Sequence, residues 1–359
     1  MKNHHIFPDY KYKEILVEKK PLLNDKGQPV EGLFNFWISL NNPAQYNSYT
    51  TDAVKEVIMA FRQASCDRST VAVVFTAVGD KAFCTGGNTK EYAEYYAGNP
   101  PEYKQYMRLF NDMVTAILLC DKPVINRVNG MRVGGGQEIG MACDFSIAAD
   151  TARFGQAGPK HGSAPDGGST DFLHLYVGVN RALESCTLCK HWSAVQATNL
   201  GLINKVVPVY KNKEGKFIRT PFVQTEMVDE WGNPSFGAFK TGNAMQEAKR
   251  VAEECTVDLS LLDAEVSKMC FELAMTMPDC LSKTLESVRK KKLEHWQQNS
   301  ETNRSWLALN MMTEAKAGFR AFNEGPKNNR EVDFLKLRRA LADAHPWDDE
   351  LIAMVMPKG

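Results

Sequence analysis

The sequence lacks both a surplus of charge and a long apolar run. Its 359 residues include 43 basic and 43 acidic side chains, so the formal net charge is +0. Balanced charge does not favour nucleic acid or an anionic membrane surface as a partner. No apolar stretch approaches the ~20 residues of a membrane-spanning helix, and the opening segment MKNHHIFPDYKYKE has no signal-peptide core. These absences predict a soluble, cytoplasmic protein with no nucleic-acid or membrane partner.

The sequence also lacks a disulfide or metal-ligand pattern, because its nine cysteines are scattered and odd in number. One pair, Cys186 and Cys189, has C-x-x-C spacing, with His191 two residues beyond. Alone, such a pair indicates a redox centre or half of a zinc site. No second Cys/His pair stands at matching spacing, and residues 181–192 have the pattern of an amphipathic helix. We therefore expect reduced thiols and no metal site.

Strand-like and helix-like segments alternate through the first half of the chain, which predicts an α/β fold. Short apolar or alternating runs predict strands, and apolar residues at helical spacing predict helices. The expected strands are 34–40, 71–75, 124–128 and 145–149, and the expected helices are 51–64, 101–120 and 137–143. Helical patterns return near the C-terminus at 244–257, 262–277, 281–298 and 302–323.

The most informative segment is Asn129–Asp144, NGMRVGGGQEIGMACD. The glycines at 134–136 allow unusual backbone dihedrals and leave room for a ligand to approach the main chain. If a helix starts here, its first N–H groups favour negative charge, and Glu138 lies in its first turn. A glycine-rich turn with a capping glutamate is the structural alternative.

A second glycine motif lies upstream, in Lys81–Glu91, KAFCTGGNTKE. It follows the apolar run 71–75, which predicts a buried strand. Gly86 and Gly87 would then form a turn beyond this strand, where α/β proteins tend to place their ligands. This second motif favours a functional interpretation of the glycine segment at 134–136 over the structural alternative.

Together the two motifs resemble the fingerprints AFxAGxDxKE and NGxxxGGGxELxxxCD of the crotonase, or enoyl-CoA hydratase/isomerase, superfamily. Residues 42–48, 154–156, 164–169 and 194–207 resemble further segments of the same family in the same order. The resemblance implies the crotonase fold, a spiral of β-β-α turns followed by a C-terminal helical region. It implies an enzyme with an acyl-CoA substrate, no cofactor beyond that substrate's own coenzyme A, and a homotrimer or homohexamer.

The resemblance also assigns roles at the reacting centre, and the chain departs from the hydratases there. The backbone N–H groups of Gly87 and Gly135 would hold the thioester oxyanion, and Glu138 matches the first catalytic glutamate. Gly158 replaces the second glutamate. Asp166 appears in the following loop, PDGG, where some members place a working aspartate; the alternative is a turn aspartate that accepts backbone hydrogen bonds. His161 is a secondary candidate for carrying a proton.

Glu138, the lost second glutamate, Asp166, the long insertion and the extended C-terminus together resemble one branch of the family, and this resemblance implies a hydrolase that acts on a C–C bond of a cyclic oxo-acyl-CoA. Two carboxyl groups in one pocket can hold different protonation states, so that one activates water while the other delivers a proton. Three other functions stay open: a 2-enoyl-CoA hydratase, an acyl-CoA thioester hydrolase, and a non-catalytic relative that binds coenzyme A or RNA.

Coenzyme A contacts are expected, from the resemblance, at Gln45, Asn47, Gly86, Asn88, Lys90 and Lys291. Lys291 belongs to the basic run 289–292, RKKK, the one charge cluster of the chain. This run is interpreted either as a solvated helical face or as a contact to coenzyme A phosphates.

Four regions are predicted along the chain. Residues 1–209 form the catalytic core, and 210–243, rich in proline, glycine and aromatic residues, form an irregular insertion. Long irregular loops are often functional, so this one is a lid over the acyl pocket or a surface hairpin. Residues 244–325 form a helical trimerisation region, and 326–359 an extension with a possible oligomer contact at Pro346, Trp347 and 351–356.

Overall fold

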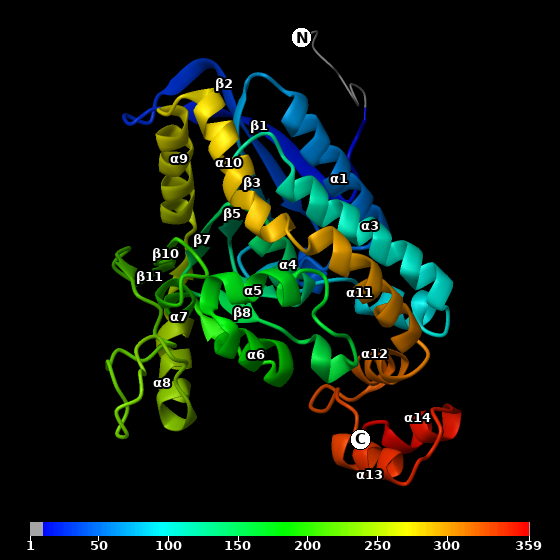
Figure 1. The fold of residues 1–359 in the computed structure, drawn as a ribbon. Coiled ribbons are helices and arrows are strands. Elements are labelled where there is room, and N and C mark those ends of the chain that lie inside the picture. Colours follow the sequence, from blue (N-terminus) through cyan, green and yellow to red (C-terminus); the bar gives the residue numbers. More distant parts are fainter. Residues whose placement is uncertain (1–9, 359) are drawn as a thin grey trace.

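A six-stranded sheet crosses the middle of the molecule (Figure 1) in the computed structural model, which describes residues 10–358. Its order is β1-β2-β3-β5-β7-β10, with β1 antiparallel to β2 and the other pairs parallel. The strands are β1 (Ile15–Leu23), β2 (Pro29–Leu40), β3 (Thr70–Ala77), β5 (Val124–Val128), β7 (Phe145–Ala149) and β10 (Lys205–Val207). The expected strands at 34–40, 71–75, 124–128 and 145–149 are confirmed.

Helices cover both faces of this sheet, which explains why its central strands are apolar on both sides. Helices α1 (Thr51–Cys66) and α3 (Pro100–Leu118) pack on one face through the main core. On the other face, α9 (Ser260–Ala274) buries Leu262, Val266 and Cys270 against the strands. The expected helices at 51–64 and 101–120 are confirmed.

A second, four-stranded sheet has the order β4-β6-β8-β9. Its strands are β4 (Ala82–Cys84), β6 (Met131–Val133), β8 (Arg153–Gly155) and β9 (Trp192–Ser193). Three successive turns of the chain place one strand in the large sheet and the next in the small one: β3 and β4, β5 and β6, β7 and β8. The expected spiral of β-β-α turns is thereby confirmed. Because β4, β6 and β8 are parallel neighbours, their carboxyl ends meet at one edge.

The C-terminal third is helical, as expected, and ends in a small cluster of its own. Its helices are α10 (Pro278–Leu293), α11 (Trp296–Asn310), α12 (Glu314–Glu324), α13 (Phe334–Ala342) and α14 (Asp349–Val355). Helices α13 and α14 lie against α12 (Figure 1) and bury Leu337, Leu351, Ile352 and Val355 with α12 alanines. Leu351, Ile352 and Val355 are thus covered by the same chain, and the oligomer contact at Pro346, Trp347 and 351–356 stays a prediction.

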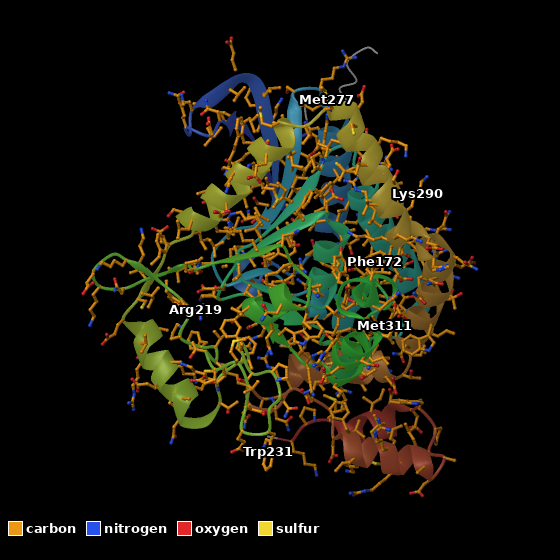
Figure 2. All side chains as sticks on the ribbon, turned by 60° about the vertical axis from the view of Figure 1, so that its left-hand side comes forward. Phe172, Arg219, Trp231, Met277, Lys290 and Met311 are labelled. Carbon is orange, nitrogen blue, oxygen red and sulfur yellow. The ribbon has the colours of Figure 1, made fainter. Side chains whose placement is uncertain are left out.

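Residues 210–243 contain little regular structure. Strand β11 (Tyr210–Lys211) pairs with β12 (Phe217–Ile218) and with β13 (Thr256–Val257), which follows α8 (Gly242–Glu253). Asp150 fastens this segment, because its carboxylate accepts hydrogen bonds from the backbone of Val209 and Thr220. Trp231 lies at the outer end of the segment and is 81% exposed (Figure 2).

Several predicted helices end earlier than the sequence pattern indicated. The helix expected at 262–277 ends at Ala274, and the one expected at 281–298 is divided between α10 and α11. The helix expected at 244–257 stops at Glu253, because Thr256 and Val257 pair with β11. The helix expected at 302–323 is broken between α11 and α12, where the Asn310 side chain bonds to Thr313 and to the Gly162 carbonyl. The helix expected at 181–192 is α6 (Val179–Leu188), and it ends at Cys189 with a φ of 54°.

Candidate active site

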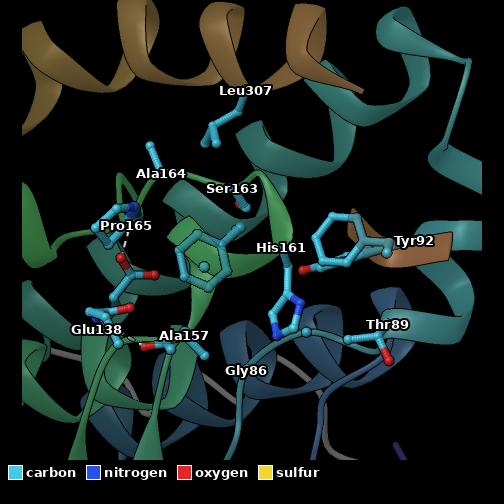
Figure 3. A pocket seen from close by; sticks show the side chains of 18 of the residues that line it. Gly86, Thr89, Tyr92, Glu138, Ala157, His161, Ser163, Ala164, Pro165 and Leu307 are labelled. Carbon is cyan, nitrogen blue, oxygen red and sulfur yellow. Dashed lines mark hydrogen bonds between the residues drawn. The ribbon is translucent and has the colours of Figure 1, made fainter. Parts of the chain in front are cut away.

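A cavity of about 110 Å³ opens where the carboxyl ends of β4, β6 and β8 meet (Figure 3). Its walls come from both glycine motifs, from the loop 157–167 and from the C-terminal helices. The lining residues include Tyr49, Gly86, Gly87, Tyr92, Tyr103, Gly135, Glu138, Gly158, His161, Leu307 and Phe319. The fold therefore gathers segments that are more than two hundred residues apart, including most of the predicted catalytic residues.

The two glycine motifs form a cradle at this cavity. Gly86 has a φ of 104° and Gly134 a φ of 59°, both in the region that favours glycine. A side chain on Gly86 would begin 3.0 Å from the Gly135 nitrogen, so the two turns lie against each other. Gly135 begins α4 (Gly135–Ala142), and neither its N–H nor that of Gly87 has an acceptor among residues 10–358. Two N–H donors at one cavity suit an oxyanion.

Tyrosine hydroxyl groups fill the space that a side chain would need at Gly87 and at Gly135. A Cβ on Gly87 would lie 1.7 Å from the Tyr92 hydroxyl, and one on Gly135 would lie 2.0 Å from the Tyr49 hydroxyl. Sequence reasoning missed both tyrosines. A signal was present in 92–106, YAEYYAGNPPEYKQY, where tyrosines recur at helical spacing.

Glu138 is the carboxylate that faces the cavity. It lies in the first turn of α4, is 6% exposed, and accepts hydrogen bonds from the backbone N–H groups of Gly167 (3.0 Å) and Ser169 (3.4 Å). Burial raises the pKa of Glu138 to about 8, and the negative charges of Asp166 and Asp171 add to that rise. At neutral pH this carboxyl group therefore holds its proton for most of the time.

Asp166 lies beside the cavity but not in its wall, which is formed by Pro165 and Gly167. Its carboxylate accepts a hydrogen bond from the Thr170 hydroxyl at 2.9 Å, at the start of α5 (Ser169–Val177). Burial raises the pKa of Asp166. The structure thus brings Glu138 to the cavity, while Asp166 acts on it through charge.

The loop 158–163 contains Gly158, the position at which the family resemblance would place a second catalytic glutamate. A Cβ on Gly158 would lie 2.2 Å from the Ser163 carbonyl oxygen, so the loop leaves no space for a side chain there. His161, from the same loop, projects into the cavity (Figure 3), and its ring packs edge-on against Phe322. Burial lowers the pKa of His161, and its Nδ1 is buried without a hydrogen-bond partner in the described chain. The imidazole is therefore neutral at neutral pH.

Comparison with known proteins agrees with this geometry. The family model described as enoyl-CoA hydratase/isomerase matches residues 36–219. The chain belongs to the enoyl-CoA hydratase/isomerase family. A solved structure of a family member from Xanthobacter autotrophicus Py2 is similar with a TM-score of 0.63 and 21% identity, covering 94% of this chain and 99% of that one. The structure of an enoyl-CoA hydratase from Mycobacterium avium subsp. paratuberculosis is similar with a TM-score of 0.61 and 20% identity, covering 88% of this chain and 97% of that one.

Three curated relatives are much more similar, and each is named 6-oxocyclohex-1-ene-1-carbonyl-CoA hydrolase. The protein from Thauera aromatica is 59% identical, with 99% of this chain and 94% of the relative covered. The protein from Geobacter metallireducens is 61% identical, with 96% and 90% covered. The protein from Syntrophus aciditrophicus is 47% identical, with 96% and 91% covered.

Some of the residues predicted to contact coenzyme A lie at or near the cavity, and others lie away from it. Gly86 lines the cavity, and near it Asn88 donates to Gln45 at 2.8 Å, while Lys90 is exposed. Asn47 is 1% exposed and its side-chain amide bonds to backbone atoms of residues 42, 78 and 82, so this side chain holds the local turn. Lys291 is exposed on α10, near Glu294, and does not line the cavity.

The basic run that contains Lys291 is only partly a solvated face. Arg289 is 4% exposed and forms a salt bridge of 2.5 Å with Asp144, together with hydrogen bonds to the carbonyls of Cys120 and Lys122. Lys292 donates to two carbonyls at the C-terminal end of α4, at 2.8 Å each. These two side chains fasten α10 to the helix that carries Glu138.

No helix in the part of the chain that the structure describes is long and apolar enough to cross a membrane.

Proposed function

We propose that this chain is a 6-oxocyclohex-1-ene-1-carbonyl-CoA hydrolase. The observation that carries the proposal is the 47–61% identity, over nearly the whole chain, to three relatives with that name. The cavity supports it, because it has an oxyanion cradle and one facing carboxylate, with no space at Gly158 for the second glutamate of a hydratase. The cyclic substrate would undergo hydration and then hydrolytic ring cleavage to 3-hydroxypimeloyl-CoA.

In the hydration step, water adds to the ring carbon β to the thioester. The ionised form of Glu138 takes the proton of that water, and charge collects on the thioester oxygen as an enolate. The N–H groups of Gly87 and Gly135 hold this oxygen; such a donor contributes about 3 kcal/mol to the transition state. Glu138 then returns the proton to the α-carbon, which completes the addition.

In the cleavage step, a second water attacks the ring ketone and its proton passes to the neutral His161. The ring bond between the ketone carbon and the α-carbon breaks, and its electron pair moves into the thioester enolate. Protonation of the α-carbon by His161 leaves a carboxylic acid at one end and the thioester at the other. The thioester is the electron sink, so we propose that no cofactor beyond the substrate's own coenzyme A takes part.

Product analysis in ¹⁸O-labelled water tests the proposed function. The cyclic oxo-enoyl-CoA should give a ring-opened product with label in both the new hydroxyl and the new carboxylate. Label in the hydroxyl alone would identify a hydratase, and release of free coenzyme A would identify a thioester hydrolase. Glu138→Gln should abolish label uptake, whereas Glu94→Gln, on an exposed side chain, should not change it.

We further propose a homotrimer or homohexamer in the cytoplasm. Leu175, Leu183 and Leu188, on α5 and α6, are 48–60% exposed, which suits burial against another subunit. All nine cysteines are free, as is usual in a reducing compartment. Sedimentation equilibrium of the purified protein tests the assembly, and a monomer at micromolar concentration would contradict it.

A further inference from the structure

Four buried tyrosines form a cluster beside the oxyanion cradle. Tyr92 and Tyr96 lie on a π-helical turn (Tyr92–Tyr96), and Tyr103 and Tyr106 lie on α3; all four are 3–8% exposed. Their rings contact one another, with centroids 4.9–6.2 Å apart. Phenylalanine rings could pack in the same way, so the four hydroxyl groups require a separate explanation.

The hydroxyl groups of Tyr92 and Tyr106 are 2.7 Å apart and form a hydrogen bond. Tyr92 lines the cavity, whereas Tyr106 lies behind it and does not. Either hydroxyl can donate in this bond; when Tyr106 donates, the Tyr92 proton can point toward the cavity, where Tyr103 is its other neighbour. Burial raises the pKa of Tyr92 well above its ordinary value, so this hydroxyl stays a proton donor throughout the neutral range.

The proposed reaction develops charge on two different oxygens. The thioester oxygen carries it during hydration and after the ring bond breaks, whereas the ring-ketone oxygen carries it when the second water adds. One carbon atom separates the two carbonyl groups, so their oxygens are neighbours in space. A donor for the ketone oxygen must therefore lie beside the thioester cradle. The Tyr92 hydroxyl meets this condition, since it lies directly against Gly87.

The positions of Glu138 and Tyr92 on opposite walls of the cavity also correspond to the positions of the two reacting carbons in the substrate. In Figure 3 Glu138 and Tyr92 lie on opposite sides of the cavity, with His161 between them. In the substrate, the carbon that is hydrated and the ketone carbon flank the α-carbon on its two sides. With the thioester in the glycine cradle, hydration falls on the Glu138 side and ring cleavage on the Tyr92 side.

We propose that Tyr92 is a catalytic residue of ring cleavage, and that Tyr106 is its positioning residue. The assignment rests on the proposed function. Water oxygen bonds to the ketone carbon as its proton moves to His161, and the ketone π electrons move to the oxygen, which accepts the hydrogen bond of Tyr92. The carbonyl then re-forms, the ring bond breaks, and its electron pair enters the thioester enolate.

The two steps can be measured separately, because the hydrated ring and the ring-opened acid are different products. Tyr92→Phe should slow ring cleavage roughly 100-fold, the typical effect of losing one oxyanion donor, and leave hydration within about threefold. The hydrated cyclic intermediate should therefore accumulate. Tyr106→Phe should slow cleavage in the same selective way by roughly tenfold. Tyr95→Phe is the matched control, because Tyr95 is 54% exposed on the same turn, and it should change neither step.

A Tyr92→Phe protein that cleaves the ring at the wild-type rate, or that loses both steps equally while its melting temperature is unchanged, would overturn the assignment. If Tyr92→Phe does not fold, Tyr106→Phe decides by the same ratio of hydration to cleavage. Failure of the proposed function gives a different result, because the wild-type protein itself would then make no ring-opened product.

Discussion

Glu138 and Asp166 have different positions and therefore different expected roles. Glu138 faces the cavity and Asp166 does not, yet the Asp166 charge helps to raise the pKa of Glu138 to about 8. A base acts in its ionised form, so hydration should become faster as the pH rises through the pKa of Glu138. Asp166 thus influences the pH at which the enzyme works.

We predict that Asp166→Asn moves the rising limb of kcat/KM to lower pH. Removing the negative charge makes ionisation of Glu138 less costly, so its pKa falls. Thr170→Ala is the control, since it keeps the charge and removes only the 2.9 Å hydrogen bond to Asp166. The pH profile of hydration is the measurement. Complete loss of activity at every pH would instead make Asp166 a direct proton carrier.

At the scale of elements, the sequence predicted four strands of the large sheet and the two glycine turns, because each depends on local pattern, whereas the short strands of the small sheet were missed. Strands 124–128 and 145–149 are short apolar runs, and the motifs around Gly87 and Gly135 follow strands of the small sheet. The orientation of Asp166 and the proximity of Tyr92 to Gly87 were not predictable. They depend on how the loop 157–167 and the turn 92–96 pack against distant elements, which no local pattern encodes.

The contact between α10 and the end of α4 has a structural role. The basic run 289–292 did not indicate this role, because it was interpreted as a solvated face or as a coenzyme A contact. Arg289 and Asp144 are both nearly buried and are joined by two side-chain hydrogen bonds. Removing one partner of a buried ion pair leaves the other charge uncompensated, which costs about 3–5 kcal/mol. We predict this loss in the free energy of unfolding for Arg289→Ala.

Lys291→Ala provides the comparison within the same run, because Lys291 is exposed and pairs loosely with Glu294 at 3.4 Å. Its unfolding free energy should change by at most about 0.5 kcal/mol. Urea unfolding of both variants measures the difference. Equal stability of the two variants would show that Arg289 does not anchor α10.

At the scale of the whole molecule, the C-terminal extension supports the active site from behind. Helices α13 and α14 cover one side of α12, and the other side of α12 supplies Phe319 to the cavity wall. Gly318 lies against the backbone of His161, so a shift of α12 reaches that histidine directly. The extension is therefore expected to affect activity although none of its residues lines the cavity.

Leu351→Ala and Leu335→Ala test this connection with the same chemical change. Leu351 is 0% exposed between α14 and α12, whereas Leu335 is 66% exposed on α13. Truncating a buried leucine typically costs about 2–5 kcal/mol, so Leu351→Ala should loosen α12, speed its amide hydrogen exchange and lower ring cleavage. Leu335→Ala should leave both unchanged. If Leu351→Ala accelerates exchange only in α13 and α14 and keeps full activity, the extension folds as a separate unit and α12 holds the cavity wall without it.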